Sequence, residues 1–449
     1  MFGSSKLKET IPESQAHSAG LQSRSGESDP AREHYHHIHS HVVNAIEASV
    51  VVKLSAQELE SRIAQLVNNI VSNSQLPLGN RDVANVVRQL VDELLGLGPL
   101  QPLIDDPVVT DIMVNGHREV YVEKMGKLSK TEVQFRSEEQ LLNLARRVVS
   151  KVGRRIDESS PMVDARLEDG SRLNVMIPPL ALDGTYISIR KFSQDKLSLN
   201  QLAQKGSMSD SMVRLLDIIV RSRLNVLVAG GTGAGKTTLL NAMSFSISPQ
   251  ERIITIEDAA ELKLQQPHVI RAETRPANAE GLAAVSQREL LKNALRMRPD
   301  RIVLGEVRGE EAFEMMQAMN TGHDGSLCTL HANSSLDALI RIENMLLMAQ
   351  SSLPLYALRR QVADTIDVVV QIERMRDGKR RVVAITEVQG LEGEQYITQD
   401  LYRYVIQGED VQGNVLGHYR SGNSMPQFTE KAAYYQLESQ LRHAMEMTS

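Results

Sequence analysis

One octapeptide limits the possible folds of this chain more than any other feature. Residues 230–237 read Gly-Gly-Thr-Gly-Ala-Gly-Lys-Thr and match the pattern G-x-x-x-x-G-K-[ST]. An apolar run of strand length, 225–229, precedes the octapeptide, and helix-forming residues follow it over 238–243. A glycine-rich loop between a strand and a helix turns backbone N–H groups inward and adds the positive end of the helix dipole. The segment therefore predicts a phosphate-binding loop in an α/β domain, and its flanks argue against a chance lysine in a glycine-rich loop.

Each polar side chain of this loop has an expected role. Lys236 would place a positive charge on the outer phosphates of a nucleotide, and the Thr237 hydroxyl would bind Mg²⁺. The glycine spacing does not fit G-x-G-x-x-G, which disfavours a dinucleotide site. The expected nucleotide-binding residues are Gly230, Gly231, Thr232, Gly233, Ala234, Gly235, Lys236, Thr237 and Thr238.

Three acidic residues follow a second apolar strand, 253–256. Glu257, Asp258 and Glu261 would stand at the carboxyl end of this strand, where a parallel α/β sheet binds its ligand. Phosphoryl transfer needs a carboxylate that orients and polarises the attacking water. Acids at strand ends also serve as plain helix caps, so this run by itself leaves a catalytic and a structural role open.

A third apolar strand, 301–304, leads into Gly305 and Glu306. It resembles the second nucleotide-binding strand of P-loop enzymes, but Gly305 stands where an aspartate often does. Glu306 is the only acid at that strand end, and it is therefore the candidate residue for holding magnesium. Asp300, at the start of the strand, would lie at the wrong edge of the sheet.

Two histidines, His323 and His331, bracket a short expected strand, with Gly322 and Gly325 flanking the first of them. Each could reach a γ-phosphate or relay its presence, whereas a lone histidine is by default a packed core residue. Cys328, the only cysteine, lies between them. Without a second cysteine or a suitably spaced third ligand a zinc site is disfavoured, and an intrachain disulfide is excluded. The single cysteine also fits a reducing compartment.

Composition narrows the remaining classes of protein. The chain has 449 residues, which as a prior is about three domains, and a net charge of −6. This mild acidity excludes a protein that coats polyanions. With no tryptophan, 10 tyrosines and 6 phenylalanines, a nucleic-acid reader built on stacked aromatic platforms is disfavoured. No apolar run reaches membrane-spanning length, and the first 15 residues lack the apolar core of a secretory signal.

Changes of periodicity divide the chain into four expected parts. Residues 1–40 predict a disordered tail whose histidines either belong to a polar tail or helix start or bind a metal. Residues 41–98 predict a helical module, and 99–197 predict an α+β domain with period-two strands. The nucleotide-binding domain would occupy 198–449, after a linker that begins near residue 195.

Four blocks resemble the ATPases of the secretion superfamily, which power type II secretion, type IV pili and type IV secretion. Three further blocks, 159–167, 174–184 and 187–192, resemble the tight-adherence (Flp) pilus branch with its CpaF-like ATPases. The spacing of His323 and His331 is typical of that branch and of the type IV secretion branch. The resemblance covers about residues 55 to 425. The four superfamily blocks are G-G-T-G-A-G-K-T, E-D-A-A-E, R-P-D-R-I-V-L-G-E-V-R-G and T-G-H-D-G-S-L-C-T-L-H-A-N.

The resemblance implies a C-terminal RecA-like P-loop NTPase domain, preceded by a PAS-like α+β domain and a small helical module. It also implies ATP and Mg²⁺ as cofactors, Glu261 as the base that activates water, and Glu306 and Thr237 as the magnesium-associated residues. His323 and His331 would form a histidine pair near the γ-phosphate. Arginines of the N-terminal domain would help to bind that phosphate, although a surface strand residue is the alternative for the first candidate. These candidates are Arg190 and, as weaker ones, Arg271 and Arg275.

The same resemblance implies a homohexameric ring in the cytoplasm, at the cytoplasmic face of the inner membrane. The ring would reach the membrane through platform proteins of a pilus, and no direct contact with nucleic acid is expected. ATP binding would close the N-terminal domain on the C-terminal one about a hinge at 195–209, and this motion would drive pilus assembly or retraction. Two alternatives stay open: a type IV secretion ATPase that moves protein or DNA, and an assembly protein in which ATP binding is regulatory.

Five basic residues surround an expected hairpin turn at Asp377-Gly378. They either dock on an acidic partner surface or anionic lipid, or they form a solvated hairpin edge that discourages strand addition. The five are Arg374, Arg376, Lys379, Arg380 and Arg381.

Overall fold

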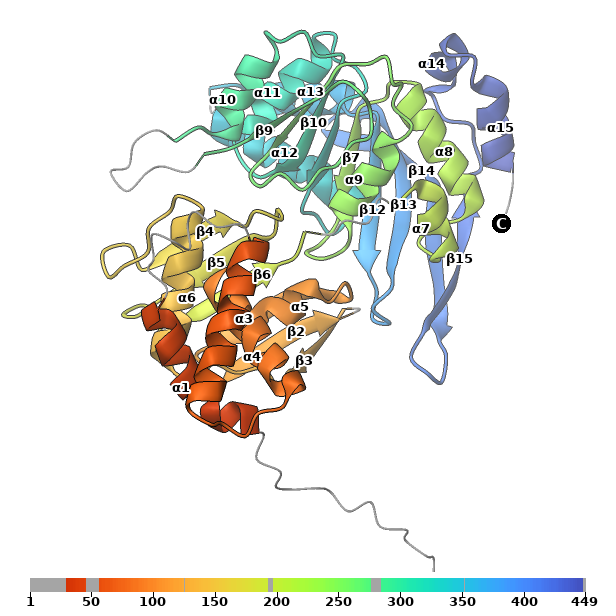
Figure 1. Ribbon diagram of the computed structural model, residues 1–449. Coiled ribbons are helices and arrows are strands. Elements are labelled where there is room, and N and C mark those ends of the chain that lie inside the picture. Colours follow the sequence, from red (N-terminus) through yellow and green to blue (C-terminus); the bar gives the residue numbers. More distant parts are fainter. Residues whose placement is uncertain are drawn as a thin grey trace, which may run out of the picture. The chain divides into compact units, whose positions relative to one another are not determined.

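The protein has a mixed α/β fold, as the sequence predicts, and its described residues form two compact units within 1–105 and 106–449. In the part of the chain that is described, no helix is long and apolar enough to cross a membrane. The computed structural model describes residues 30–45, 56–124, 126–192, 197–275, 284–350 and 352–446 (Figure 1).

The first unit is helical. Helix α1 (Pro30–Ala45) begins inside the stretch that was expected to be a disordered tail, because Tyr35, Ile38 and Val42 recur at helical spacing and are buried. These three residues form one apolar cluster with side chains of α3 and α4, so the expectation of a disordered tail is wrong for residues 30–40. Residues 1–29 lie outside the described part of the chain. The remaining elements are α3 (Ala56–Asn73), α4 (Asn80–Leu94), the 3-10 helix η1 (Gly98–Leu100) and α5 (Gln101–Asp105).

Six antiparallel strands form the first sheet of the second unit, in the order β3-β2-β1-β6-β5-β4. Buried and more exposed side chains alternate along the strands, as the period-two pattern predicts, and Ile112 and Val114 of β1 are buried. Helix α6 begins after Ser137, whose hydroxyl accepts a hydrogen bond from the backbone N–H of Gln140. The elements are β1 (Val109–Asn115), β2 (Glu119–Lys124), β3 (Lys127–Lys130), α6 (Glu138–Lys151), β4 (Met162–Arg166), β5 (Arg172–Met176) and β6 (Tyr186–Arg190).

A nine-stranded sheet forms the rest of the second unit, in the order β15-β14-β13-β12-β7-β11-β10-β8-β9. The six strands from β12 to β9 are parallel, and the last three continue the sheet antiparallel from β12. The strands are β7 (Val226–Ala229), β8 (Ile253–Glu257), β9 (Val269–Glu273), β10 (Arg301–Val307), β11 (Leu327–Leu330), β12 (Val368–Arg374), β13 (Arg380–Glu392), β14 (Gln395–Glu409) and β15 (Val415–Ser421).

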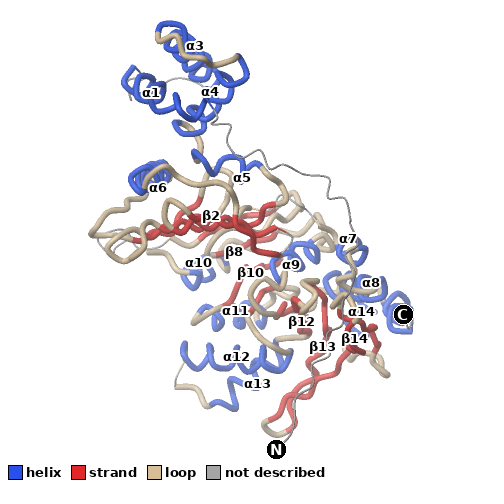
Figure 2. The backbone as a smooth tube through the Cα atoms, turned by 90° about the horizontal axis from the view of Figure 1, so that it is seen from below, coloured by secondary structure: helices blue, strands red, loops and turns tan. Residues whose placement is uncertain are grey.

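Helices cover both faces of this sheet (Figures 1 and 2). On one face Val226 and Val228 pack in a cluster with α7, α8, α9, α14 and α15. On the other face Leu227 and Ala229 pack with α10, α11, α12 and α13. A central strand buried on both faces reads as a continuous apolar run, which is why 225–229 is recognisable in the sequence. The helices are α7 (Leu199–Gln204), α8 (Asp210–Arg221), α9 (Lys236–Ser244), α10 (Gln287–Ala294), α11 (Glu311–Asn320), α12 (Ser335–Ala349), α13 (Leu355–Thr365), α14 (Thr429–Tyr434) and α15 (Glu438–Glu446).

The parallel strands all end at one edge of the sheet, which we call the carboxyl edge. The glycine-rich loop follows β7, Glu306 lies near the end of β10, and His331 follows β11. The turn between β12 and β13 lies at this edge as well, because β12 runs parallel to β7. The amino edge, at the starts of the same strands, carries a different set of charged residues.

Candidate functional site

The glycine-rich loop after β7 has the geometry of an anion cradle. Gly233 and Gly235 have φ angles of 69° and 100°, in the left-handed region that favours glycine, and Gly235 is the N-cap of α9. A Cβ atom on Gly230 would lie 2.3 Å from the backbone oxygen of Ile372, so this position also excludes a side chain. The loop thus brings backbone N–H groups and the N-terminus of α9 to the carboxyl edge.

Lys236 is the first residue of α9 and is 8% exposed. Its Nζ donates a hydrogen bond to the backbone oxygen of Gly231 at 3.1 Å and lies 3.3 Å from His331 Nε2. The carboxylate of Glu306 is 3.9 Å away, and burial lowers the pKa of Lys236 below that of an exposed lysine. A bound anion would stabilise the charged form of this buried ammonium group, because its one carboxylate is distant.

Glu306 lies between Lys236 and two other cationic or titratable groups. The Nε2 atom of His331 is 2.8 Å from Glu306 Oε1, and Arg308 Nε donates to Glu306 Oε2 at 2.8 Å. Burial and the charge of Lys236 lower the pKa of His331, which favours its neutral form. Glu306 Oε1 is buried and faces both His331 Nε2 and, at 3.9 Å, Lys236 Nζ.

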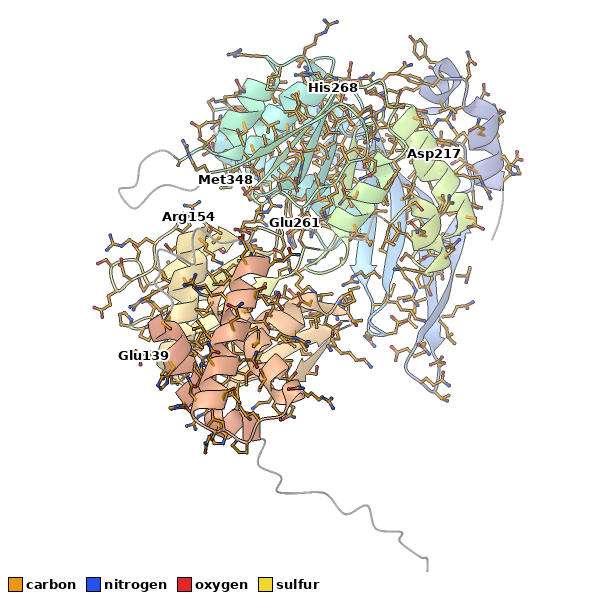
Figure 3. All side chains as sticks on the ribbon, viewed as in Figure 1. Glu139, Arg154, Asp217, Glu261, His268 and Met348 are labelled. Atoms are coloured by element: carbon orange, nitrogen blue, oxygen red, sulfur yellow. The ribbon has the colours of Figure 1, made fainter. Side chains whose placement is uncertain are left out.

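Glu261 stands on the turn that follows β8 and is half-buried (Figure 3). Glu257, the last residue of β8, accepts hydrogen bonds at its Oε2 from the backbone N–H groups of Glu261 (2.8 Å) and Leu262 (2.9 Å). Burial lowers the pKa of Arg308, but its hydrogen bond to Glu306 and the charges of Glu306, Asp258 and, least, Glu261 raise this pKa overall. The turn therefore brings a second carboxylate to the vicinity of the Arg308–Glu306 pair.

The two histidines lie at opposite ends of β11. His331 follows the strand and belongs to the Lys236–Glu306 cluster, whereas His323 precedes it and contacts the backbone oxygen of Ala318 through Nδ1 at 3.2 Å. Within one chain the two histidines therefore lie at opposite edges of the sheet, because strand β11 separates them. Their roles near a γ-phosphate stay a prediction.

Comparison with known proteins places this geometry in a family. The family model for the type II/IV secretion system protein matches residues 93–400. The chain belongs to this family. It is 40% identical over 322 residues to a putative conjugal transfer protein of Mycobacterium tuberculosis strain H37Rv, with 70% of this chain and 91% of that protein covered. It is 32% identical over 347 residues to the type IV secretion system protein VirB11 of Bartonella quintana, covering 69% and 94%.

A solved relative is the VirB11 ATPase of the Brucella suis type IV secretion system, crystallised in complex with sulphate. It is 30% identical, the match covers 67% of this chain and 95% of that one, and the TM-score is 0.35. As a member of the type II/IV secretion ATPase family, the chain is expected to bind a nucleotide at the glycine-rich loop.

The residues present suit ATP with Mg²⁺. The cradle that a Cβ would fill and the buried Lys236 fit phosphate oxygens, while the carboxylate of Glu306 and the hydroxyl of Thr237 are the hard oxygen donors that Mg²⁺ prefers. Glu306 and Thr237 would hold the ion, which would neutralise phosphate charge there. Among the described residues no group of three or more His, Cys, Asp or Glu side chains could bind a metal by itself, so a purely protein-built metal centre is not found.

The arginine candidates from the sequence lie in three different places. Arg190 pairs with Asp111 of β1 at 3.2 Å and is exposed. Arg271 donates to the backbone oxygen of Ala260 at 3.3 Å, next to Glu261, and Arg275 forms a β-bridge with Val285. Of these candidates, Arg271 is the one that contacts the turn of the candidate base.

Arg166 is an arginine that sequence reasoning missed. It stands on β4, pairs with Glu273 of β9 at 2.6 Å and also donates to the backbone oxygen of Ala260. A second missed residue is Arg308, which pairs with Glu306. Arg166 lies inside the block 159–167 and Arg308 two residues after Glu306, so both positions were within conspicuous motifs.

Several basic side chains of the hairpin between β12 and β13 contact other segments of the chain. Arg380 Nε donates to the backbone oxygen of Gly233 at 2.9 Å, in the glycine-rich loop. Arg381 is buried and pairs with Asp377 at 2.8 Å, which holds the pKa of that aspartate down to about 2. Arg374 donates to the backbone oxygen of Gly126. Arg376 pairs with Glu409 at 3.4 Å, so four of the five basic side chains have internal partners, and Arg380 contacts the anion cradle. Arg374, Arg376, Lys379 and Arg380 are nonetheless exposed, so the docking surface and the solvated hairpin edge both stay predictions.

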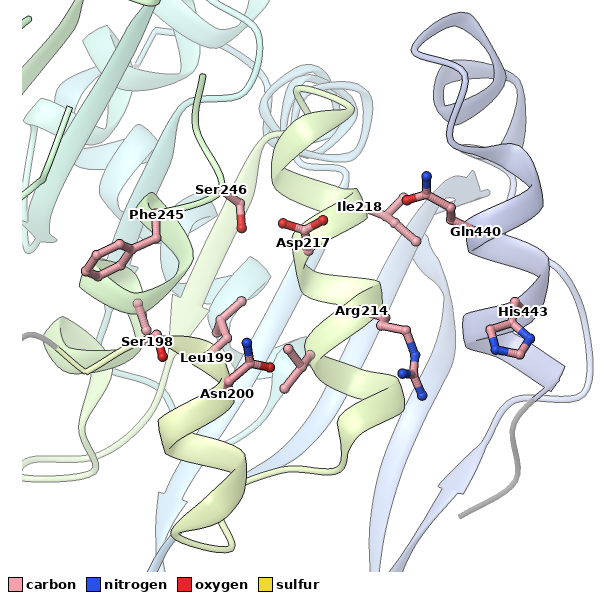
Figure 4. Close-up of a pocket in the computed structure, with 12 residues that line it drawn as sticks. Ser198, Leu199, Asn200, Arg214, Asp217, Ile218, Phe245, Ser246, Gln440 and His443 are labelled. Carbon is pink, nitrogen blue, oxygen red and sulfur yellow. The ribbon is translucent and has the colours of Figure 1, made fainter. Parts of the chain in front are cut away.

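A separate pocket of about 450 Å³ lies between α7, α8, the C-terminal end of α9 and α15 (Figure 4). Arg214 and Asp217 of α8 line it, together with Gln440 and His443 of α15. None of the expected nucleotide-binding residues contributes to its lining. This pocket is therefore not the candidate ATP site.

Proposed function

We propose that this protein is an ATP-hydrolysing motor of a secretion or pilus system. The observation that carries the proposal is the convergence of Lys236, Glu306 and His331 at the mouth of the glycine-rich loop. A buried cation, a carboxylate and a neutral histidine together suit the outer phosphates of ATP and their metal ion.

Each residue has a distinct part in the proposed reaction. Lys236 binds the outer phosphates, and the loop N–H groups hold their oxygens. Glu261 orients a water molecule for in-line attack on the γ-phosphorus and accepts its proton. His331, held beside Glu306, senses or contacts the departing phosphate. Arg271 and Arg166, which touch the turn of Glu261, are better placed than Arg190 or Arg275 to influence the reaction within one chain.

The system that the motor serves has two candidates. The blocks at 159–167, 174–184 and 187–192 support a tight-adherence pilus ATPase of the CpaF-like type. The likeness to a conjugal transfer protein and to VirB11 supports a type IV secretion ATPase that moves protein or DNA. We propose the pilus motor first, because its three blocks lie outside the nucleotide site and so do not follow from ATP binding alone.

The proposed assembly is a homohexamer at the cytoplasmic face of the inner membrane, bound to platform proteins rather than to lipid or nucleic acid. Opening and closing of the N-terminal domain on the nucleotide-binding domain would transmit each turnover to the platform. The linker at 195–209 is the proposed hinge, and residues 195 and 196 within it lie outside the described part of the chain.

Steady-state ATP hydrolysis by wild type, Lys236→Ala and Glu261→Gln tests the motor. We expect wild-type turnover to exceed that of Lys236→Ala by at least a hundredfold, and Glu261→Gln to bind ATP without hydrolysing it. Wild-type turnover no higher than Lys236→Ala would leave only a regulatory role for ATP. Full activity of Glu261→Gln would remove the base assignment.

Replacement of the chromosomal gene by the Lys236→Ala allele separates the two candidate systems. Loss of surface pili with normal conjugal DNA transfer supports the pilus motor. The reverse result, pili present and DNA or effector transfer lost, supports the type IV secretion ATPase. Electron microscopy counts the pili, and a plasmid-mating assay counts the transfer events.

A further inference from the structure

Gly305 and Glu257 occupy one shared space between two neighbouring strands. Strands β8 and β10 are paired in parallel, with Ile256 opposite Leu304. A Cβ atom on Gly305 would lie 2.7 Å from Cγ of Glu257 and 3.3 Å from its Oε2, which is closer than a real side chain allows. The carboxylate of Glu257 therefore fills the place that an acid on β10 itself would take.

Strand β10 cannot move away from Glu257 to relieve this packing. The backbone oxygen of Gly305 accepts a hydrogen bond from Thr329 Oγ1 of β11 at 2.6 Å. The backbone of β10 is also paired with β8 through Leu304 and with β11 through Val303 and Leu304. Glycine at position 305 is thus required by the neighbour's side chain, and not by a backbone angle.

The filled space has a consequence for the candidate base. Glu257 is 3% exposed, and its Oε2 accepts both N–H groups of Glu261 and Leu262. Two hydrogen bonds to one buried oxygen fix the turn that carries the Glu261 side chain. The other oxygen, Oε1, has no hydrogen-bond partner among the described residues, and burial raises the pKa of Glu257 to about 7. A buried carboxyl group with an orphan oxygen costs stability, which is typical of residues retained for function.

We propose that Glu257 is a positioning residue that holds Glu261 in place for water activation, and that Gly305 is glycine in order to admit it. The inference rests on the proposed function, because Glu261 is the proposed base. In this proposal the carboxylate of Glu257 on β8 occupies the space that an aspartate at position 305 of β10 would otherwise fill.

Four variants test the contact from both sides. Glu257→Ala removes the acceptor, and Gly305→Ala forces the Glu257 side chain away. We expect each to lower kcat for ATP hydrolysis by about twentyfold or more, with KM for ATP within threefold, because small displacements of a reacting group are costly. The double variant should be no worse than Glu257→Ala alone, since both changes break one contact. Glu257→Gln keeps an acceptor oxygen and should retain kcat within threefold.

Glu387→Ala is the matched control. Glu387 is a buried glutamate on β13 that accepts the backbone N–H of Phe428 at 3.1 Å, away from the glycine-rich loop. Its removal should lower the thermal midpoint and leave kcat within twofold. An equal loss of kcat in this control would reduce the effect of Glu257→Ala to general destabilisation and overturn the proposal.

Amide hydrogen exchange provides a readout that does not depend on hydrolysis. Peptides covering 258–262 should exchange faster in Glu257→Ala and Gly305→Ala, and at the wild-type rate in Glu387→Ala. The proposal is overturned if Glu257→Ala and Gly305→Ala both exchange at the wild-type rate, or if both keep wild-type kcat. If Glu257→Ala does not fold, the result for Gly305→Ala decides alone. If instead wild-type turnover equals that of Lys236→Ala while exchange responds as expected, the proposed function fails and the positioning contact stands.

Discussion

The two ends of strand β10 differ in how their charges are satisfied. At the amino edge Arg301 is 1% exposed, and its guanidinium donates to both carboxylate oxygens of Glu251, at 2.7 and 3.0 Å. It also donates to the backbone oxygens of Val220 (2.8 Å) and Gly325 (3.2 Å). This end of the strand is a closed network, in which a buried charge has a partner on every side.

At the carboxyl edge the charges around the same strand are paired less completely. Lys236 is buried, and its Nζ lies 3.9 Å from Glu306 Oε1, which itself lies 2.8 Å from His331 Nε2. A buried charge is normally closely paired, so a buried ammonium group this far from a carboxylate marks where an anionic ligand is expected. The difference teaches that one strand is paired for stability at its start and presents residues of the proposed site at its end.

The largest expected effect is a loss of stability when the closed network around Arg301 is broken. Arg301→Met leaves Glu251 without its bidentate partner, and loss of one member of a buried ion pair typically costs about 3–5 kcal/mol. We expect a loss of that size in the free energy of unfolding, measured by urea denaturation. Arg271→Met, an exposed arginine at the carboxyl edge, is the control and should change stability by less than about 1 kcal/mol. A loss below about 1 kcal/mol in Arg301→Met would show that the network is not stabilising.

The second prediction concerns pH. Burial raises the pKa of Glu257 to about 7 from an ordinary value near 4.5, so the folded protein holds a proton there that the unfolded chain has lost. The contribution of this group is most favourable below about pH 4.5 and is lost as pH rises through about 7. Relative to Glu257→Gln, wild type should therefore lose about 3 kcal/mol of stability between pH 5 and 8. Parallel curves for the two proteins in urea titrations at each pH would contradict the prediction.

The direction of the parallel strands explains which features of the two sheet edges the sequence predicts. The octapeptide 230–237 and the acid at 306 follow apolar strands, so the carboxyl edge could be assembled from pattern alone. The same rule places Asp300 at the amino edge and, applied to β11, would also have placed His323 there. The sequence therefore contained the signal that separates the two histidines, although their matching spacing in a motif drew attention to them as a pair.

Other features depend on contacts between distant segments, and no local pattern predicts them. The burial of Arg301 requires Glu251 and Gly325 to meet at one point, and a lone arginine at a strand start reads as exposed. The fit of Glu257 against Gly305 depends on the register of two strands nearly fifty residues apart. The sequence pattern does not predict the whole helix over 30–45. Polar residues and histidines are more numerous there than the three buried residues that define its apolar stripe.

A third prediction separates the two ends of β11. His331 touches the Lys236–Glu306 pair, so His331→Ala should lower kcat by about ten- to a hundredfold, equivalent to about 1.4–2.7 kcal/mol of activation free energy. His323 lies at the amino edge, and His323→Ala should change kcat by less than threefold. Equal losses in the two variants would mean that His323 reaches an active site after all, which in this fold requires a neighbouring chain. Hydrolysis at saturating ATP gives the comparison directly.

The smallest expected effect on stability comes from replacing Lys236. It is a gain in stability, whereas Arg301→Met is expected to cause a loss. Lys236 is buried with its ammonium group desolvated, and the lowered pKa reports that its charged form is disfavoured without a ligand. Lys236→Met keeps the aliphatic stem and removes the charge, so we expect the ligand-free protein to gain up to about 1 kcal/mol while ATP binding and hydrolysis are lost. Thermal melts without nucleotide, and again with ATP and Mg²⁺, separate these two consequences: the variant should melt higher than wild type in the first condition and gain nothing in the second. A variant that melts lower without nucleotide would mean that Lys236 is paired as completely as Arg301, and the contrast between the two edges would not hold.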